Sequence, residues 1–220
     1  MLTLLIIAIS SYLIGGIPTG YLAVKYKRNI SSLTFGTGNI GASNVTALAG
    51  FKYGMMVGAF DCLVKGALPI IICQLLGQPT YVQAITGIGC VIGHNWSPYM
   101  KARGGRGVAT SIGILIAFQM WLSLIIFIIL IGVIGKLLFK DTAFWVLTSF
   151  IALPFTTLAV HSEPLTYTCL FLLLILILKR ITGNWENPRN NNQLHSTLFN
   201  RILFDRDIGS KKDWEIKTGL

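Results

Sequence analysis

Long apolar runs, separated by short polar stretches, dominate the chain, and strict alternation of polar and apolar residues is rare. A bilayer core about 30 Å thick requires roughly 20 apolar residues per helix, and several runs approach that length. The pattern therefore predicts an all-α, polytopic membrane protein. The seven predicted spans are Leu2–Val24, Gly54–Leu76, Tyr81–Trp96, Gly107–Gln119, Trp121–Phe139, Ala143–Val160 and Leu165–Leu178.

The boundary between the fourth and fifth spans, near Gln119–Met120, lacks the Gly or Pro that usually marks a turn. The alternative is one helix from Gly107 to Phe139, about 50 Å long at 1.5 Å per residue. With seven spans, the Lys and Arg residues of the loops and span ends all fall on one side, whereas the merged helix moves Lys136 and Lys140 to the other side. The positive-inside rule thus favours seven spans, with the N-terminus outside and the C-terminus in the cytoplasm.

Composition changes the interpretation of charge rather than the fold class. The chain is 53% hydrophobic and 12% charged, with a net charge of +10. Such a charge would suggest nucleic acid in a soluble protein, but beside spans it indicates orientation, so no nucleic-acid partner is expected. The first span is too long to be only a signal peptide, and no small-residue cleavage site follows it. We expect a membrane domain over residues 1–185 and a basic, flexible or membrane-surface tail over 186–220.

The chain offers few residues for metal or covalent chemistry. Its four cysteines lie in apolar stretches at spacings that fit neither a zinc site nor a redox pair, and its three histidines form no paired ligands. We therefore expect no metal and no cofactor. A GxSxG motif is absent, which disfavours a serine acyl-enzyme. The HxxxxD dyad of thioester-dependent glycerolipid acyltransferases is also absent, since the fifth residues after the histidines are Tyr99, Thr166 and Asn200.

The first basic loop contains a glycine-rich segment, Phe35–Asn44, with sequence FGTGNIGASN. Glycine allows the backbone to approach a phosphate closely and to adopt positive φ, while Thr, Ser and Asn add neutral hydrogen-bonding groups. A flexible connector explains the composition equally well. The segment is not a Walker motif, because GxxxxGK[ST] is absent.

The third loop gives a sharper signal. It runs from Gly93-His94 through Lys101 to the segment Arg103–Thr110, with sequence RGGRGVAT, directly before a span. Arginine suits bidentate phosphate binding, and a helix N-terminus attracts anions. A cluster of charges that only sets orientation would not explain the glycines. We favour a phosphate-binding role.

Ionisable residues inside a span form the third feature. Asp61 and Lys65 lie four residues apart, share one helix face and can pair. Charged groups within spans are costly and usually face a site or a polar interior. A structural ion pair and a functional role both remain open. His94 is a candidate general base, although a structural hydrogen bond is the more common role of a lone histidine.

Taken in order, these motifs resemble the bacterial acyl-phosphate:glycerol-3-phosphate acyltransferases, the PlsY family. The resemblance is specific from Gly16 to Thr110 and is mainly one of topology beyond it. It rests on Gly16-Ile17-Pro18-Thr19-Gly20-Tyr21, Gly36–Asn44, Asp61-x-x-x-Lys65-Gly66, Gly93-His94 and Gly104–Thr110. It implies acyl transfer from acyl phosphate to the 1-hydroxyl of glycerol 3-phosphate, giving lysophosphatidic acid for phospholipid synthesis. It also implies a bacterial inner-membrane location with a cytoplasmic active site.

Carried over by position, Thr37 stands where the family usually has Ser, and Arg106 where it often has Lys. Ala47 stands where a phosphate-binding Arg is expected. If Arg180 is the family's C-terminal Arg, its preceding Asn and His are replaced by Ile177 and Leu174, for which Asn184 or Asn187 are candidate substitutes. The predicted catalytic residues are His94, Lys65 and Arg106; the predicted substrate-binding residues are Thr37, Gly38, Asn39, Gly41, Asn44, Asp61, Lys101, Arg103, Gly104, Gly105, Gly107, Thr110 and Arg180.

An acyl phosphate is already activated, so positioning and charge stabilisation suffice for direct transfer without an acyl-enzyme. We expect Arg103, Arg106 and Lys65 to bind phosphates and the acyl chain to lie between spans. Two alternatives remain: a transporter or flippase of a phosphorylated lipid or anion, and a catalytically weak, substrate-binding paralogue. The almost uniformly apolar outer halves of the spans argue against transport, whereas Ala47 and Ile177 keep the paralogue open.

Overall fold

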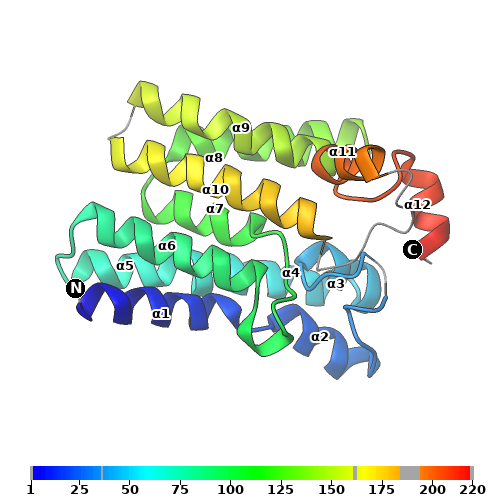
Figure 1. The fold of residues 1–220 in the computed structure, drawn as a ribbon, viewed down its shortest axis with the longest axis horizontal. Helices are drawn as coiled ribbons and strands as arrows, with labels where there is room; N and C mark the ends of the chain where they lie inside the picture. The colour runs from blue at the N-terminus through cyan, green and yellow to red at the C-terminus, as the bar shows by residue number, and fades with distance from the viewer. Residues whose placement is uncertain (1, 36, 161–162, 184–193, 219–220) are drawn as a thin grey trace. The chain divides into compact units, whose positions relative to one another are not determined.

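The computed structural model describes residues 2–35, 37–160, 163–183 and 194–218, and nearly all of these residues are helical (Figure 1). The predicted all-α membrane fold is confirmed. The chain divides into two compact units, Met1–Met120 and Trp121–Leu220. Among the described residues, four helical stretches are long and apolar enough to cross a membrane: Leu2–Arg28, Phe51–Leu75, Trp121–Leu138 and Glu163–Thr182. The count of seven spans and the orientation of the termini stay predictions.

The first unit is built on two close helix pairs. α1 packs along α6, and the π-helical turn η1 packs on α7. In Figure 1, α1 and α6 lie side by side. The elements of this unit are α1 (Leu2–Gly16), α2 (Thr19–Arg28), α3 (Ala42–Ala49), α4 (Phe51–Phe60), η1 (Asp61–Ala67), α5 (Leu68–Leu75), α6 (Thr80–Asn95), η2 (Pro98–Met100) and α7 (Val108–Ala117).

A bend at residues Gly16–Gly20 divides the first predicted span into α1 and α2. Pro18 has no N–H to donate and disfavours helical geometry at Ile17, so the regular hydrogen-bond ladder stops there. A tight contact replaces it, in which the Thr19 N–H donates to the Ile17 carbonyl at 2.9 Å. Helical bonding resumes when the Leu22 N–H donates to the Pro18 carbonyl at 3.0 Å. We call residues 16–20 the bend.

The second predicted span runs without interruption through α4, η1 and α5, from Phe51 to Leu75. Its centre, Asp61–Ala67, is π-helical. Pro69 follows at the start of α5. A proline crowds the carbonyl one turn before it and cannot donate to it, which favours a wider turn at that point. This turn carries both ionisable residues of the span.

The predicted break near Gln119–Met120 is confirmed, and the single helix from Gly107 to Phe139 is wrong. α7 ends at Ala117, and the next helix begins at Trp121. Gln119 adopts a left-handed backbone with φ of 54°. The Met120 N–H donates to the Leu115 carbonyl at 2.9 Å, which closes the end of α7.

The second unit contains α8 (Trp121–Phe127), η3 (Ile128–Leu138), α9 (Ala143–Val160), α10 (Glu163–Thr182), α11 (Leu194–Phe204) and α12 (Lys211–Thr218). α9 packs against α10, and α11 contacts both. The rings of Phe127 and Phe150 pack in its core at a tilt of 54°, with ring centroids 5.1 Å apart.

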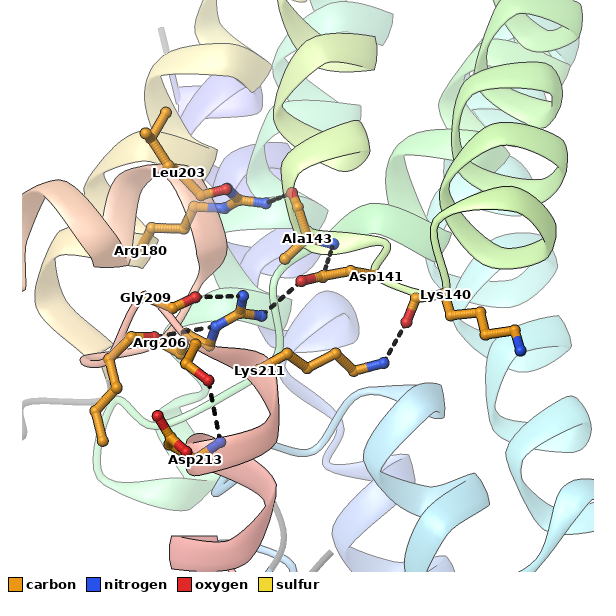
Figure 2. A network of polar contacts seen from close by, with 11 residues as sticks. Lys140, Asp141, Ala143, Arg180, Leu203, Arg206, Gly209, Lys211 and Asp213 are labelled. Carbon is orange, nitrogen blue, oxygen red and sulfur yellow. Dashed lines mark hydrogen bonds and ion pairs between the residues drawn. The ribbon is translucent and has the colours of Figure 1, made fainter.

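Residues 194–218 of the tail contain two helices, α11 and α12. The flexible or membrane-surface character expected for the tail stays a prediction. Polar contacts hold this segment to the turn before α9 (Figure 2). Arg206 Nη1 donates to Asp141 Oδ2 at 2.8 Å, and Lys211 Nζ donates to the Lys140 carbonyl. The predicted boundary at 185/186 lies outside the described residues, as do Asn184 and Asn187.

Candidate functional site

Lys65 lies at the centre of a buried polar cluster in the first unit. Its side chain is 0% exposed. The ammonium lies 2.7 Å from Asp61 Oδ1 and donates to the Ile17 carbonyl at 2.6 Å and to Thr19 Oγ1 at 3.1 Å. An ammonium has three N–H donors, and each has an acceptor here. This geometry does not support the phosphate-binding role expected for Lys65, because no donor is left for a ligand.

Asp61 completes the cluster with both of its carboxylate oxygens. Oδ1 accepts from Lys65 and also from the Thr19 hydroxyl at 2.8 Å. Oδ2 lies 3.8 Å from His94 Nδ1. The predicted pairing of Asp61 with Lys65 is confirmed. Thr19 and the Ile17 carbonyl are partners that sequence reasoning missed, although a proline bend that frees carbonyls beside an intramembrane lysine was a usable signal.

His94 lies in the last turn of α6 and against the third loop. The Gly105 N–H donates to the His94 carbonyl at 3.0 Å. A Cβ on Gly105 would overlap His94 Nε2, and one on Gly104 would overlap the His94 carbonyl. The two glycines are therefore required for the loop to cross the end of α6. His94, 3% exposed, is enclosed between Asp61 and Gly105, which favours a structural role over that of a general base.

The basic residues of the third loop differ in exposure. Lys101 and Arg103 are exposed, and Arg106 is half-buried. Gly107 has a φ of 74° and precedes α7, and the Ser111 N–H donates to the Gly107 carbonyl at 2.8 Å. Glycine is favoured at this φ and is the natural residue for a tight entry into a helix. The loop thus leads its arginines directly to a helix N-terminus.

Thr110 lies in the first turn of α7 and is fully buried. Its hydroxyl has no hydrogen-bond partner among the residues that the structure describes. A Cβ on Gly66 of η1 would overlap the Thr110 carbonyl, so η1 and α7 approach closely at this level. The predicted contact of Thr110 with substrate stays a prediction.

Asn44 organises the glycine-rich first loop from inside. It is 1% exposed. Its Oδ1 accepts from the Thr37 N–H at 3.0 Å, and its Nδ2 donates to the Asn39 carbonyl at 2.7 Å and to the Ser32 carbonyl at 3.0 Å. Both polar atoms of the amide are therefore used by the loop itself, which makes Asn44 a residue that shapes the loop.

The other predicted residues of this loop lie nearer its surface. Thr37 is exposed, whereas Gly38, Asn39 and Gly41 are half-buried. Gly38 has a φ of 68°, and Asn39 Oδ1 accepts from the Gly41 N–H at 3.0 Å. Gly36 lies outside the described residues. The loop has a fixed turn geometry that leaves Thr37 accessible.

Both loops pack on the bend. Ser97 Oγ donates to the Gly16 carbonyl at 2.5 Å, and a Cβ on Gly16 would meet Pro98 of the third loop. A Cβ on Gly20 would overlap the Ile40 carbonyl of the first loop. The two glycine-rich loops, separate in sequence, therefore share one support in the first unit.

The resemblance to the PlsY family singles out Ala47 and Arg180, and the structure describes both. Ala47 is exposed on α3, beside Leu48, whose carbonyl accepts from Arg28 Nε at 3.0 Å. Arg180 belongs to the second unit, where its guanidinium donates to the Ile202 carbonyl at 2.5 Å and to the Ala143 carbonyl at 2.6 Å. Figure 2 shows Arg180 of α10 beside Ala143 and Leu203 of α11, and the Leu203 carbonyl also accepts from Arg180 Nη1 at 3.2 Å. The substrate-binding role of Arg180 stays a prediction.

Within the described ranges there is no group of three or more His, Cys, Asp or Glu side chains that could hold a metal ion. The candidate site is instead made of glycine-rich backbone, amides, hydroxyls and arginines. Such a set recognises anionic oxygens.

Comparison with known proteins gives consistent matches. A family model described as Glycerol-3-phosphate acyltransferase matches residues 5–190. Glycerol-3-phosphate acyltransferase 5 of Dehalococcoides mccartyi is 33% identical over 220 residues, covering 97% of this chain and 93% of the relative. Glycerol-3-phosphate acyltransferase of Lawsonia intracellularis is 41% identical over 117 residues, covering 53% of this chain and 59% of the relative.

Solved structures match as well. A crystal structure of PlsY (YgiH), an integral membrane glycerol 3-phosphate acyltransferase in its glycerol 3-phosphate form, gives a TM-score of 0.71 at 29% identity, covering 81% of this chain and 88% of that one. The lysophosphatidic acid form of PlsY (YgiH) gives a TM-score of 0.70 at 26% identity, covering 90% and 93%.

Proposed function

This chain belongs to the glycerol-3-phosphate acyltransferase family, and on that premise we propose that it uses acyl phosphate as the donor and transfers the acyl group directly to the 1-hydroxyl of glycerol 3-phosphate. The chain is an integral membrane acyltransferase of phospholipid synthesis. The solved PlsY structures are described as glycerol 3-phosphate and lysophosphatidic acid forms, which supports these molecules as its acceptor and product.

The observation that carries the proposal is the pair of glycine-rich loops supported by one bend. The reaction needs two phosphate sites, one for the acceptor and one for the donor. Loop Thr37–Asn44 offers backbone and neutral polar groups, while loop Arg103–Gly107 offers two guanidinium groups before a helix N-terminus. These two chemistries suit two phosphates held close together.

In the proposed reaction, the acceptor hydroxyl attacks the carbonyl carbon of the mixed anhydride. The new ester C–O bond forms, the bond from that carbon to the phosphate oxygen breaks, and inorganic phosphate leaves and takes up the hydroxyl proton. Arg103 and Arg106 stabilise the charge that grows on the leaving phosphate. We assign no acyl-enzyme, and we assign no ligand contact to Lys65.

We further propose that the site faces the cytoplasm of a bacterial cell whose inner membrane holds the protein. Support comes from the basic residues, which gather in loops that a seven-span topology puts on one side. Cysteine labelling of an exposed loop residue, Lys101→Cys, in intact cells and inverted vesicles tests this side. Labelling only in inverted vesicles is expected, and labelling in intact cells contradicts the orientation.

A membrane-fraction assay tests the donor. Acyl phosphate, acyl-CoA and acyl carrier protein are each supplied with glycerol 3-phosphate, and lysophosphatidic acid is measured. Turnover with acyl phosphate alone is expected. Arg106→Ala should lower kcat/KM by about 10²-fold, as loss of a charge-stabilising donor does elsewhere. The matched control is Lys136→Ala, an exposed basic residue of η3, which should retain full activity. Equal turnover from acyl-CoA would contradict the donor assignment.

A second reading, a weak substrate-binding paralogue, is favoured by one observation: Ala47 is exposed next to the first loop, where the resemblance expects an arginine. If that reading holds, Ala47→Arg should raise turnover at least about tenfold, since a bidentate charged contact to phosphate is a strong one. An unchanged or lower rate for Ala47→Arg, with measurable wild-type turnover, supports the active enzyme. Accumulation of unmodified glycerol 3-phosphate in vesicles would instead indicate transport.

A further inference from the structure

We infer that Asp61, Lys65, Thr19 and His94 form a buried positioning network that sets the geometry of both phosphate loops while touching no substrate. This inference rests on the proposed function, because it takes the two loops to be the phosphate sites. The network is defined by the contacts of Asp61 with Lys65, Thr19 and His94 and by those of Lys65 with the bend.

The network has no polar group open to a ligand at Lys65. Each N–H of Lys65 has an acceptor within the protein, and Asp61 Oδ1 already accepts from two groups. Lys65 and Asp61 are 0% and 1% exposed. A charged group that binds phosphate needs a donor facing the ligand, and Lys65 has none to offer.

Lys65 is linked to the first and third loops through the bend. Lys65 fixes two groups of the bend, the Ile17 carbonyl and the Thr19 hydroxyl. The flanking glycines of the same bend touch the loops, Gly16 against Ser97–Pro98 and Gly20 against Ile40. A shift of the bend therefore moves the support of both loops at once.

Asp61 is linked through His94 to the third loop, which carries Arg103 and Arg106. Asp61 Oδ2 faces His94 Nδ1, and the other face of the imidazole lies against Gly105. The Gly105 N–H is bonded to the His94 carbonyl, and Arg106 is the next residue. The network thus reaches the phosphate-binding loop from two directions, through the bend and through His94.

A buried ion pair of this kind is better explained by the groups that it positions than by the stability that it adds to the fold. A buried ion pair is often replaced by apolar residues of similar size with little loss of stability, so stability alone explains its presence poorly. Its directional bonds, however, fix the bend in one arrangement, and Asp61 Oδ2 lies 3.8 Å from His94 Nδ1. Misplacement of a binding group by about 1 Å can cost about 10²-fold in rate.

The main test is the charge-neutral double variant Asp61→Asn with Lys65→Met, which leaves no uncompensated buried charge. We expect folded, membrane-inserted protein in which KM for glycerol 3-phosphate rises at least about tenfold and kcat falls less. The matched control is Asp141→Asn with Arg206→Met, a neutralised pair in the second unit. It should leave KM unchanged. An unchanged KM in the folded Asp61/Lys65 double variant overturns the inference.

A second pair of variants keeps the test decisive if the double variant does not fold. Thr19→Val removes one hydroxyl and adds no charge, and Thr19→Ser keeps the hydroxyl. We expect KM for glycerol 3-phosphate to rise several-fold in Thr19→Val and to return to the wild-type value in Thr19→Ser. Equal KM values for the two variants contradict a positioning role for this hydroxyl network.

Failure of the donor proposal is distinguishable from failure of this inference. Equilibrium binding of radiolabelled glycerol 3-phosphate to the purified full chain in detergent reports the loop geometry without any donor. Weaker binding in Thr19→Val than in Thr19→Ser supports the network even if acyl phosphate is not the donor. Equal binding in the two, with glycerol 3-phosphate bound by the wild type, overturns the network even if acyl phosphate is the donor.

Discussion

The two units each contain a buried or partly buried ion pair, and the two pairs differ in what they hold. Asp61 and Lys65 lie within a candidate span, are 1% and 0% exposed, and bond to the bend that supports the two glycine-rich loops. Asp141 and Arg206 lie at the turn before α9 and near the tail helices, with 25% and 8% exposure (Figure 2). The first pair supports the candidate site, whereas the second supports α11 and α12.

Exposure explains the difference in cost. Water reaches Asp141 and screens its charge, so losing one partner leaves a group that can be solvated. No water is available to an unpaired Lys65, and a single buried charge is strongly destabilising. Two ion pairs of similar length therefore contribute differently to stability, and their surroundings decide which pair shapes the site.

The largest expected effect comes from removing one charge of the inner pair. Asp61→Ala should destabilise the protein by about 3–5 kcal/mol, because it leaves Lys65 buried without a counter-ion. Asp141→Ala should cost about 1 kcal/mol, since its partner stays hydrogen-bonded to backbone. Thermal unfolding of both variants in detergent, with the yield of membrane-inserted protein, measures the two effects. Similar losses would remove the distinction between the pairs.

The next effect concerns the loop that lies on His94. Gly105→Ala brings a Cβ into His94 Nε2, so either the loop or the imidazole must shift, and kcat/KM should fall by about 10²-fold. Gly132→Ala in η3 is the matched control, because no atom lies within 4 Å of its added Cβ. Steady-state kinetics on both variants is the measurement. Wild-type kinetics in Gly105→Ala would show that the loop tolerates displacement.

A smaller effect is expected from the first loop. Asn44→Ala removes the amide that holds Thr37, Asn39 and Ser32, which should raise KM for glycerol 3-phosphate by about tenfold, the equivalent of one lost buried hydrogen bond. Thr46→Ala, an exposed position on the same helix, should change KM little. An Asn44→Ala variant that binds the acceptor normally would mean that the loop keeps its shape by other contacts.

The smallest effect on activity belongs to the outer pair. Neutralising Asp141 and Arg206 together should loosen α11 and α12 while leaving turnover within about twofold of wild type, because the partners of Arg206 are Asp141, Ile208 and Gly209 of the same unit. Amide hydrogen exchange over residues 194–218 should accelerate. Unchanged exchange would contradict the role assigned to the pair, and a large loss of turnover would assign the tail a part in catalysis.

The membrane class, most helix positions and the two glycine-rich loops could be predicted from the residues alone. Long apolar runs leave few alternatives in a bilayer, where backbone groups must bond within helices. Spacing of four residues was enough to pair Asp61 with Lys65, and the placement of basic residues correctly favoured a break near Gln119, although no Gly or Pro marks it. The family resemblance, carried by motifs between Gly16 and Thr110, was also confirmed.

The partners of the charged and amide side chains could be read from the folded protein alone. A lysine beside glycine-rich loops suggests phosphate binding, but its donors are taken by a carbonyl and a hydroxyl that lie 48 and 46 residues away in sequence. Asn44 likewise turns inward to its own loop. The two helices within residues 194–218, α11 and α12, are held by contacts from Arg180, Arg206 and Lys211. Local pattern fixes helices because their bonds are local, whereas the partners of a buried polar group depend on which distant backbone atoms the fold brings within about 3 Å.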